Sequence, residues 1–304
     1  MTQNSPSVLR SFLFAPGNHP RRVEKALALD ADAVILDLED AVAQSAKAAT
    51  RQTVVEALSR PRKCAGYVRV NGLATQWCLG DLMEVVRPGV DGIVLPKVES
   101  AADLRTADWL IGNLERERGL PVGGIDLLPI IETAVGFTRL DRILGARSLQ
   151  DYPGRWRVRR LTFGAADFTS DVGMTWTTGE EELSEMRVRL VVASRAAGLE
   201  PPVDTVWIHL QDAAGLRASV ERSQRLGFQG RMCIHPDQVG VVNEIFTPSA
   251  DEEARARKVV EAFGKAEAAG VASIQVDGLF VDYPVVYRAR RTLATLAAIR
   301  GRKS

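Results

Sequence analysis

The chain has 304 residues, of which 46% are hydrophobic and 25% are charged, as in ordinary folded globular proteins. Its 39 lysines and arginines against 38 aspartates and glutamates leave a net charge of +1, which argues against a nucleic-acid-binding surface. No stretch approaches about 18 continuous apolar residues, so no membrane span is expected. The first seven residues are polar and lack the apolar segment of a signal peptide.

The three cysteines Cys64, Cys78 and Cys233 are scattered, without the paired spacing of a zinc site or the density of a disulfide framework. This pattern is typical of proteins from a reducing compartment. We therefore expect a cytoplasmic protein with no nucleic-acid or membrane partner.

Short apolar runs alternate with longer amphipathic stretches, and each run ends in a turn or a polar residue. In chain order, the predicted strands are residues 12–14, 33–36, 67–70, 92–95, 127–131, 161–164, 205–208 and 232–234. Continuous apolar runs suit strands that are covered on both faces, and eight β–α units predict a closed parallel TIM (β/α)8 barrel. An open doubly wound sheet is the alternative, but the chain has no GxGxxG turn.

Helical patterns fill several of the intervening stretches. Apolar residues recur at helical spacing over residues 180–197, and Gly198 is a predicted stop. The sequence Ser-Ala-Asp-Glu at residues 249–252 is a capping box that predicts a helix to about Ala269. A further helix is predicted after Pro284.

The predicted architecture is a catalytic TIM-barrel domain over residues 1–247, followed by a C-terminal helical extension over residues 248–304. Within the extension, Asp282 alone has the pattern of a turn aspartate before a helix that begins with proline. The sequence shows no internal repeat and no low-complexity tract.

Two acidic residues follow neighbouring predicted strands: Glu132 after residues 127–131 and Asp167 after residues 161–164. Active sites of parallel barrels lie at the carboxyl ends of the strands, where these side chains are expected to meet. Two carboxylates, completed by water and substrate oxygens, suit Mg²⁺, with Mn²⁺ as a substitute. The alternatives are a helix cap for Asp167 and a lysine partner for Glu132.

Arg69 lies in another apolar run and allows two interpretations. It could form a structural ion pair with Asp37 or Glu39, or hold a substrate carboxylate or a developing enolate by bidentate hydrogen bonds. We favour the substrate role. In the acidic cluster over residues 37–40, Asp37 is expected to point into the barrel mouth and to orient Arg69 or metal-bound water. Arg69 and Asp37 are therefore candidate catalytic residues.

Lys97 could form a Schiff base with a substrate, but two carboxylates make a metal-assisted mechanism sufficient. The favoured role for Lys97 is an electrostatic partner of Glu39 or Glu132. His209 and His235 are not expected to bind the metal, because Mg²⁺ prefers oxygen ligands.

His235 precedes Pro236, which indicates a structural turn. His19 is predicted in the first loop after a strand, near Arg21 and Arg22. It could help to bind a phosphate, with a solvated loop as the equal alternative.

Taken together, these segments resemble the citrate lyase β subunit/malyl-CoA lyase family of aldolases, which is related to the HpcH/HpaI group. The resemblance extends from about Arg10 to Arg291. The segments that carry it are residues 10–17, 37–40, 68–71, 95–99, 131–133, 163–167, 227–236 and 277–282. Each segment is weak evidence alone, but eight in the right order indicate the family, although not the substrate.

The resemblance implies a TIM barrel that assembles into homotrimers or hexamers. It implies Mg²⁺ on Glu132 and Asp167, with Glu132 and Arg69 at the substrate. It also implies that the Asp282 segment reaches into a neighbouring subunit's site, where the aspartate acts as an acid/base on the acetyl-CoA methyl carbon. The expected reaction is reversible cleavage of a 3-hydroxyacyl-CoA, such as malyl-CoA, citramalyl-CoA or a citryl thioester, into an acyl thioester and a 2-oxo acid.

Three departures leave the substrate open. Ala166 stands where citrate lyase relatives usually have glutamate, His209 stands where many members have an acid, and the loop over residues 146–159 is long. The alternatives are a citrate lyase β subunit that acts on a citryl group bound to an acyl carrier protein, a metal-dependent aldolase for free 2-oxo acids, and a malyl-CoA thioesterase. A binding protein without activity is the last alternative.

Overall fold

The computed structural model describes residues 8–150 and 156–303 of the chain. They form two compact units, the first spanning Leu9–Asn243 and the second beginning at Glu244. The loop over residues 146–159, which the sequence predicts to be long, lies partly outside the described residues.

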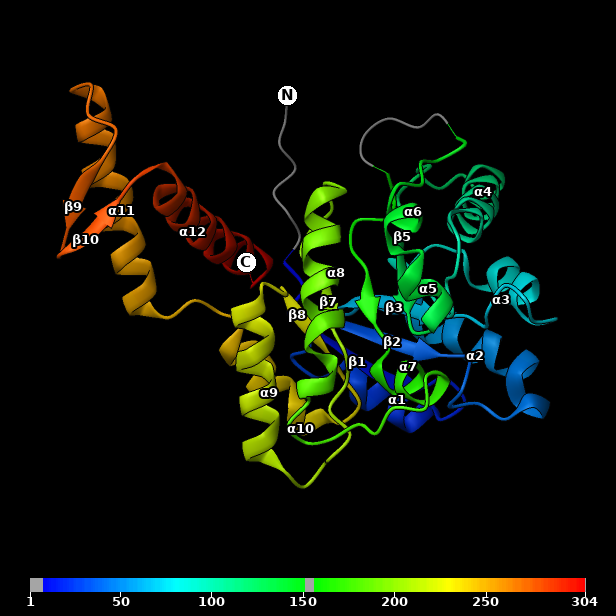
Figure 1. Cartoon of the computed structure of the whole chain (residues 1–304). Helices are drawn as coiled ribbons and strands as arrows, with labels where there is room; N and C mark the ends of the chain where they lie inside the picture. The colour runs from blue at the N-terminus through cyan, green and yellow to red at the C-terminus, as the bar shows by residue number, and fades with distance from the viewer. Residues whose placement is uncertain (1–7, 151–155, 304) are drawn as a thin grey trace. The chain divides into compact units, whose positions relative to one another are not determined.

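The first unit is a closed barrel of eight parallel strands in chain order, counted over the described residues (Figure 1). The strands are β1 (Ser11–Pro16), β2 (Ala33–Asp37), β3 (Ala65–Arg69), β4 (Gly92–Leu95), β5 (Asp126–Ile131), β6 (Thr162–Phe163), β7 (Val203–Asp204) and β8 (Gly230–Cys233). Strand β1 pairs with both β2 and β8, which closes the sheet. The predicted TIM barrel is confirmed.

Strand β7 differs from its prediction. The sequence places a strand over residues 205–208, whereas β7 ends at Asp204. Thr205 and Trp207 are buried in the loop that follows: Thr205 Oγ1 accepts the N–H of Ala165, and the carbonyl of Trp207 accepts the side-chain amide of Gln238. The apolar pattern of residues 205–208 thus reflects burial in a packed loop, and the prediction of a strand here is wrong.

Helices follow the strands and surround the barrel in Figure 1. They are α1 (Pro20–Leu27), α2 (Lys47–Leu58), α3 (Cys78–Val85), α4 (Ala101–Glu117), α5 (Ala134–Thr138), α6 (Leu140–Leu144), α7 (Ala165–Asp171), α8 (Ser184–Ala196), α9 (Ala213–Leu226) and α10 (Pro236–Ile245). The predicted helix over residues 180–197 corresponds to the 3-10 turn Glu181–Leu183 and α8. Over the described residues, no helix has the length and apolarity to cross a membrane.

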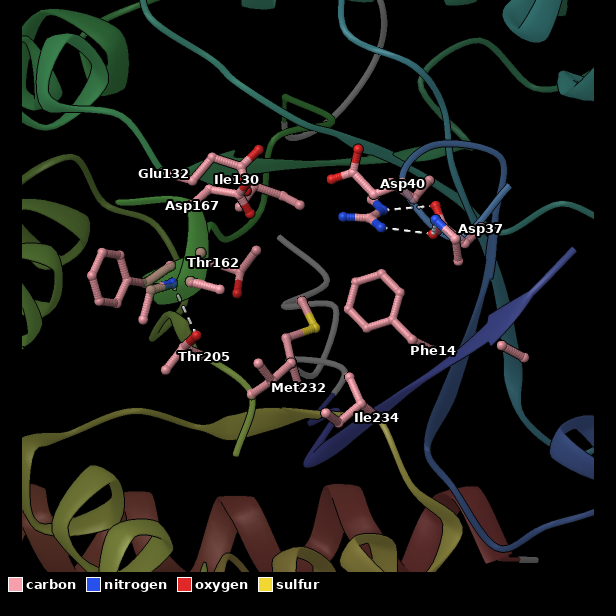
Figure 2. Close-up of a pocket in the computed structure, with 18 of the residues that line it drawn as sticks. Phe14, Asp37, Asp40, Ile130, Glu132, Thr162, Asp167, Thr205, Met232 and Ile234 are labelled. Atoms are coloured by element: carbon pink, nitrogen blue, oxygen red, sulfur yellow. Dashed lines mark hydrogen bonds and ion pairs between the residues drawn. The ribbon is translucent and has the colours of Figure 1, made fainter. Parts of the chain in front are cut away.

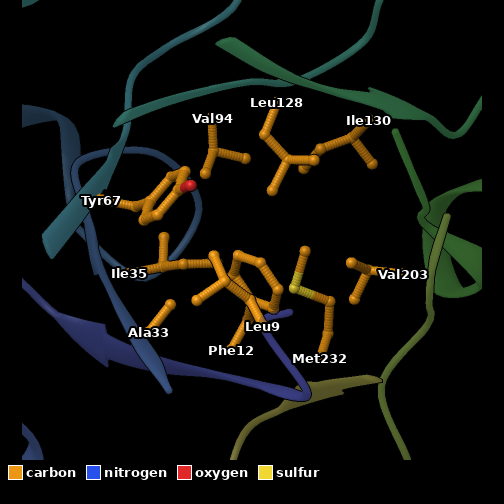
Figure 3. Packing of buried hydrophobic residues seen from close by; sticks show 10 residues of the cluster. All are labelled: Leu9, Phe12, Ala33, Ile35, Tyr67, Val94, Leu128, Ile130, Val203 and Met232. Carbon is orange, nitrogen blue, oxygen red and sulfur yellow. The ribbon is translucent and has the colours of Figure 1, made fainter. Parts of the chain in front are cut away.

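The interior of the barrel is filled by apolar side chains from most of its strands. They are Leu9, Phe12, Ala33, Ile35, Tyr67, Val94, Leu128, Ile130, Val203 and Met232 (Figure 3). At the amino end of β5, the Tyr67 hydroxyl donates to Asp126 Oδ2 at 2.7 Å. Such packing makes the barrel a solid core with its open face at the carboxyl ends of the strands.

A buried ion-pair network joins the barrel wall to the helices outside it. Arg187 of α8 donates from Nε to Asp204 Oδ2 at 3.0 Å and from Nη2 to Glu180 Oε1 at 2.9 Å. Arg231 of β8 adds a second guanidinium 3.4 Å from Asp204. Burial alone would raise the pKa of Asp204, but the two guanidinium groups lower it below its usual value.

The second unit contains α11 (Ala250–Ala268), β9 (Ile274–Val276), β10 (Leu279–Val281) and α12 (Tyr283–Lys303), packed around a core that includes Phe263 and Val286. The predicted capping box is confirmed, because Ser249 Oγ accepts from Glu252 N while the Glu252 carboxylate accepts from Ser249 N.

The antiparallel hairpin of β9 and β10 was not predicted. Its turn residues Asp277 and Gly278 both have positive φ, 49° and 80°. Positive φ at both central positions is the signature of a type I′ turn, which favours Asp-Gly. The sequence therefore contained a local signal for this hairpin.

Candidate active site

A cavity of about 370 Å³ lies at the carboxyl ends of the barrel strands (Figure 2). Four of the predicted site residues line it: Asp37, Arg69, Glu132 and Asp167. The fifth, Asp282, belongs to the second unit, where it precedes α12 and its Oδ1 accepts the N–H of Val285 at 3.4 Å. The structure therefore gathers in one cavity the polar residues that end β2 and β3 and those that follow β5 and β6.

Glu132 follows β5 and is 2% exposed. Its Oε1 accepts the main-chain N–H of Lys97 at 2.7 Å, an orientation that Lys97 provides by adopting a left-handed φ of 52°. A Cβ atom at position 164 would collide with Glu132 Oε2, so Gly164 leaves room for this carboxylate. Glu132 binds the Lys97 backbone rather than its ammonium, which argues against the predicted lysine partner.

Asp167 is half-buried in the first turn of α7, where a negative charge suits the helix dipole. The N-cap residue of this helix is Gly164, so the cap predicted as an alternative role for Asp167 is wrong. Thr205 fixes the start of α7 through its hydrogen bond from Ala165 N at 3.0 Å. Asp167 is therefore held beside the cavity by the helix that carries it, and Figure 2 shows it next to Glu132.

The surroundings of Glu132 shift its pKa far from its usual value. Burial, and then the negative charges of Asp167 and Glu39, raise the pKa of Glu132 to about 8. No group of three or more histidine, cysteine, aspartate or glutamate side chains forms a metal site within the described residues. A cation here would have two carboxylate ligands, relieve their repulsion and complete its shell with water or substrate oxygens, as Mg²⁺ commonly does.

Arg69 is held by two acids at once. It donates from Nε to Asp37 Oδ1 at 2.7 Å and from Nη2 to Asp37 Oδ2 at 2.6 Å, and its Nη1 lies 3.1 Å from Glu39 Oε2. Its guanidinium also stacks 4.9 Å from the centre of the Phe14 ring. The structural pairing considered from the sequence is present, and the same group lines the cavity, where each terminal nitrogen retains a further N–H.

Asp37 is almost fully buried beneath this guanidinium. Burial would raise its pKa, but Arg69 and the main-chain N–H groups of Glu39 and Ala41 lower it. A carboxylate held ionised in this way is a poor acid or base. The geometry favours the predicted role of orienting Arg69.

Lys97 donates from Nζ to Glu39 Oε1 at 2.7 Å, which confirms the predicted electrostatic partnership. Burial would lower the pKa of Lys97, but Glu39 raises it, so the ammonium stays protonated. An imine-forming lysine needs the opposite shift. Lys97 lines a second, polar pocket of about 350 Å³ beside the cavity.

None of the three histidines lines the cavity. His235 precedes α10 and accepts the N–H of Asp237 at Nδ1, in line with the structural turn predicted for it. His209 packs edge-on against Trp207, with ring centres 5.1 Å apart. His19 is exposed at the start of α1 and makes no capping hydrogen bond with its side chain.

Sequence reasoning missed the threonines of the cavity. Thr162 is 1% exposed and lines the cavity, yet its Oγ1 has no hydrogen-bond partner among the described residues. A hydroxyl inside the otherwise apolar run of residues 161–163 was the available signal. The remaining wall is largely apolar and includes Phe14, Ile130 and Met232.

Comparisons with known proteins agree with this fold and site. The family model described as HpcH/HpaI aldolase/citrate lyase matches residues 10–236. Citrate lyase subunit beta of Leuconostoc mesenteroides subsp. cremoris is 34% identical over 292 residues, which cover 95% of this chain and 94% of that protein. The L-malyl-CoA/beta-methylmalyl-CoA lyase of Cereibacter sphaeroides is 33% identical over 302 residues, 92% of each chain.

Among solved structures, protein CitE from Mycobacterium tuberculosis, in complex with magnesium, acetoacetate and coenzyme A, is similar with a TM-score of 0.74. It is 26% identical to this chain, and the match covers 96% of this chain and 99% of that one. The similarity therefore includes both the barrel and the C-terminal part of the chain.

Proposed function

Because the chain belongs to the HpcH/HpaI aldolase/citrate lyase family, we propose that it is a Mg²⁺-dependent carbon–carbon lyase for a 3-hydroxyacyl-CoA thioester. Its products are an acyl thioester and a 2-oxo acid, and the reaction is reversible. The observation that carries this proposal is the carboxylate pair Glu132 and Asp167 in the cavity that Arg69 also lines. The magnesium bound in the similar CitE structure supports the choice of cation.

The carboxylates of Glu132 and Asp167 are hard oxygen donors, and burial together with their mutual repulsion leaves the Glu132 pKa at about 8 until a cation compensates them. These two residues would hold the ion, with Mn²⁺ as a substitute. When bound, Mg²⁺ would supply Lewis acidity at the substrate's hydroxyl or oxo oxygen and carboxylate.

Arg69 is the group that we assign to the developing negative charge. Asp37 and Glu39 fix the guanidinium before substrate arrives, and the remaining N–H donors of its terminal nitrogens can bind an oxygen of the substrate. In the cleavage step the substrate hydroxyl gives its proton to solvent water, and its O–H electrons form the carbonyl of the 2-oxo acid. The electrons of the broken C–C bond pass to the thioester as an enolate. A donor fixed in advance stabilises that charge without reorganisation.

Asp282 is proposed to return a proton to the enolate carbon as general acid, acting from the extension of a neighbouring subunit. This requires the homotrimer or hexamer that the family resemblance implies. A thioester of coenzyme A is the proposed substrate, and an acyl carrier protein is the alternative carrier.

The test is a cleavage assay on malyl-, citramalyl-, β-methylmalyl- and citryl-CoA, in which any 2-oxo acid is trapped as its hydrazone. We expect a hydrazone from at least one thioester, lost after EDTA treatment and in Glu132→Ala. Release of malate in place of glyoxylate would identify a thioesterase. A folded, Mg²⁺-binding protein that is silent on the whole panel would instead indicate a carrier-bound or CoA-free substrate.

A further inference from the structure

The charges around the cavity are strongly unbalanced. Four carboxylates line it, those of Asp37, Asp40, Glu132 and Asp167, whereas Arg69 is the single cationic side chain among the described residues of its wall. Arg69 is already paired with Asp37 and Glu39. A divalent cation held by Glu132 and Asp167 would offset those two acids and leave little positive charge for a ligand beyond one carboxylate.

The rest of the cavity wall is largely apolar. Its apolar side chains are those of Phe14, Ile130, Phe163, Val206, Met232 and Ile234. In Figure 2, Met232 and Ile234 lie across the pocket from Glu132 and Asp167, whereas Ile130 lies beside these acids. Phe14 stacks on the Arg69 guanidinium. Ile130, Phe163 and Met232 are each at most 4% exposed. Around Met232 and Ile234, this surface gains from contact with a small apolar group and offers a carboxylate no ionic partner.

Lys97, another cation of the barrel mouth, does not correct the imbalance. Its ammonium donates to Glu39 Oε1 at 2.7 Å and lies 3.9 Å from Asp40 Oδ2. It lines the neighbouring polar pocket and not the cavity wall.

We propose that the 2-oxo-acid part of the substrate carries one carboxylate and a hydrogen or small alkyl substituent, so that the site takes malyl- or citramalyl-type thioesters in preference to citryl thioesters. This inference rests on the proposed lyase function. The second carboxylate of an oxaloacetate unit would face either the apolar wall or further carboxylates, and a buried charge without a partner is costly. A hydrogen or methyl group at the same position meets a surface of matching chemistry.

Binding of the free oxo acids tests the inference without requiring catalysis. The full-length protein, saturated with Mg²⁺, is titrated with pyruvate and with freshly prepared oxaloacetate in a calorimeter. We expect pyruvate to bind at least tenfold more tightly. Equal or tighter binding of oxaloacetate overturns the inference.

A charge introduced on the apolar wall provides the second test. Ile234 is 39% exposed, so a longer polar side chain fits there without disturbing the core. Ile234→Lys should reduce the preference for pyruvate over oxaloacetate at least tenfold, whereas the uncharged control Ile234→Gln should leave it unchanged. A folded Ile234→Lys protein with the wild-type preference would contradict a charge-based selection.

Thioester cleavage separates this inference from the proposed function. Cleavage of citryl-CoA in preference to malyl- and citramalyl-CoA would keep the lyase and remove the inference. Selective binding of pyruvate with no cleavage of any CoA thioester would keep the inference about the cavity and remove the CoA thioester as the substrate of the proposed lyase. Cleavage of malyl- or citramalyl-CoA at least a hundredfold faster than citryl-CoA is the expected result for both.

Discussion

Asp37 and Arg69 form a bidentate ion pair across neighbouring strands, with both N–O distances at or below 2.7 Å. The two residues are register partners at the carboxyl ends of β2 and β3. The parallel pairing of β2 with β3 therefore places the Asp37 carboxylate where it accepts two hydrogen bonds from the Arg69 guanidinium. Arg69 is thus fixed by a partner that belongs to the sheet itself.

Replacing Asp37 by asparagine should lower kcat/KM of the lyase reaction about 10- to 100-fold, because Arg69 loses its charged anchor but not its position in the chain. The loss should fall mainly on kcat, since the orientation of Arg69 matters most as charge develops in the transition state. Steady-state kinetics with the best thioester measure it. Asp40→Asn is the control: its exposed carboxylate forms no hydrogen bond or ion pair with Arg69 in the described structure, and a similar loss there would contradict the anchoring role.

The raised pKa of Glu132 makes metal binding depend on pH. With a pKa of about 8, caused by burial and then by Asp167, Glu132 is mostly protonated at pH 7 until metal displaces the proton. Mg²⁺ affinity should therefore rise with pH up to about 8 and then level off. Calorimetry at pH 7 in two buffers of different ionisation enthalpy should show release of nearly one proton, and none at pH 9.5.

The matched control is Glu132→Gln, which should bind Mg²⁺ weakly and without proton release. Release of the same proton by this variant would assign the titration to another group.

Thr162 and Thr205 offer a matched pair of threonine-to-valine changes. Thr162→Val removes a hydroxyl with no partner in the described structure, so stability should stay constant or rise by up to about 1 kcal/mol, while kcat/KM falls several-fold. Thr205→Val leaves the buried N–H of Ala165 unpaired and should cost about 1–3 kcal/mol. Urea unfolding and steady-state kinetics measure both. Strong destabilisation by Thr162→Val with unchanged activity would show that the hydroxyl is structural.

The buried ion-pair network that joins the barrel wall to α8 predicts an effect on stability. Arg187→Met would remove the guanidinium that Glu180 and Asp204, both fully buried, share at hydrogen-bond distance, and leave Arg231 as their common cationic neighbour. It should destabilise the protein by about 3–5 kcal/mol in urea unfolding. Arg189, two positions along the same helix, is 38% exposed and 3.9 Å from Asp141. Arg189→Met should cost less than about 1 kcal/mol, and equal effects of the two changes would refute the network's importance.

The proposed role of Asp282 in a neighbour's site predicts complementation between inactive chains. Glu132→Ala and Asp282→Asn should each abolish cleavage when expressed alone. Co-expression of the two variants should restore about a quarter of wild-type activity, because sites in mixed oligomers can combine an intact barrel with an intact extension. Failure to recover activity in oligomers shown to contain both chains would exclude a shared site.

The strands and the site could be predicted where a continuous apolar run ends in a charged residue. The apolar run over residues 127–131 predicted β5, and the acid that follows it predicted the site residue Glu132. A charged residue directly after a buried parallel strand is costly unless it has a role at the open end of the barrel. The same logic failed at residues 205–208, since loop packing buries Thr205 and Trp207 as effectively as a sheet would. Apolar patterns report burial, and they do not report strand pairing.

The sequence could not decide whether Arg69 pairs with an acid of the protein or binds the substrate. The pairing with Asp37 depends on the β2–β3 register, which local patterns do not specify. The sequence also could not predict that the Thr162 hydroxyl lacks a hydrogen-bond partner, because this is known only when all of its neighbours are placed. In contrast, the capping box at Ser249 is a local interaction between residues three positions apart, so the sequence alone predicts it.

Lys97 connects two acids through different parts of one residue. Its main-chain N–H binds Glu132, while its ammonium binds Glu39. Every amino acid except proline supplies that N–H, and the left-handed backbone at this position would suit glycine well. A substitution at position 97 can therefore change the charge of the barrel mouth, while the main-chain hydrogen bond to Glu132 is kept. During evolution of this fold, the charge at position 97 can thus vary without a change in the orientation of the proposed metal ligand Glu132.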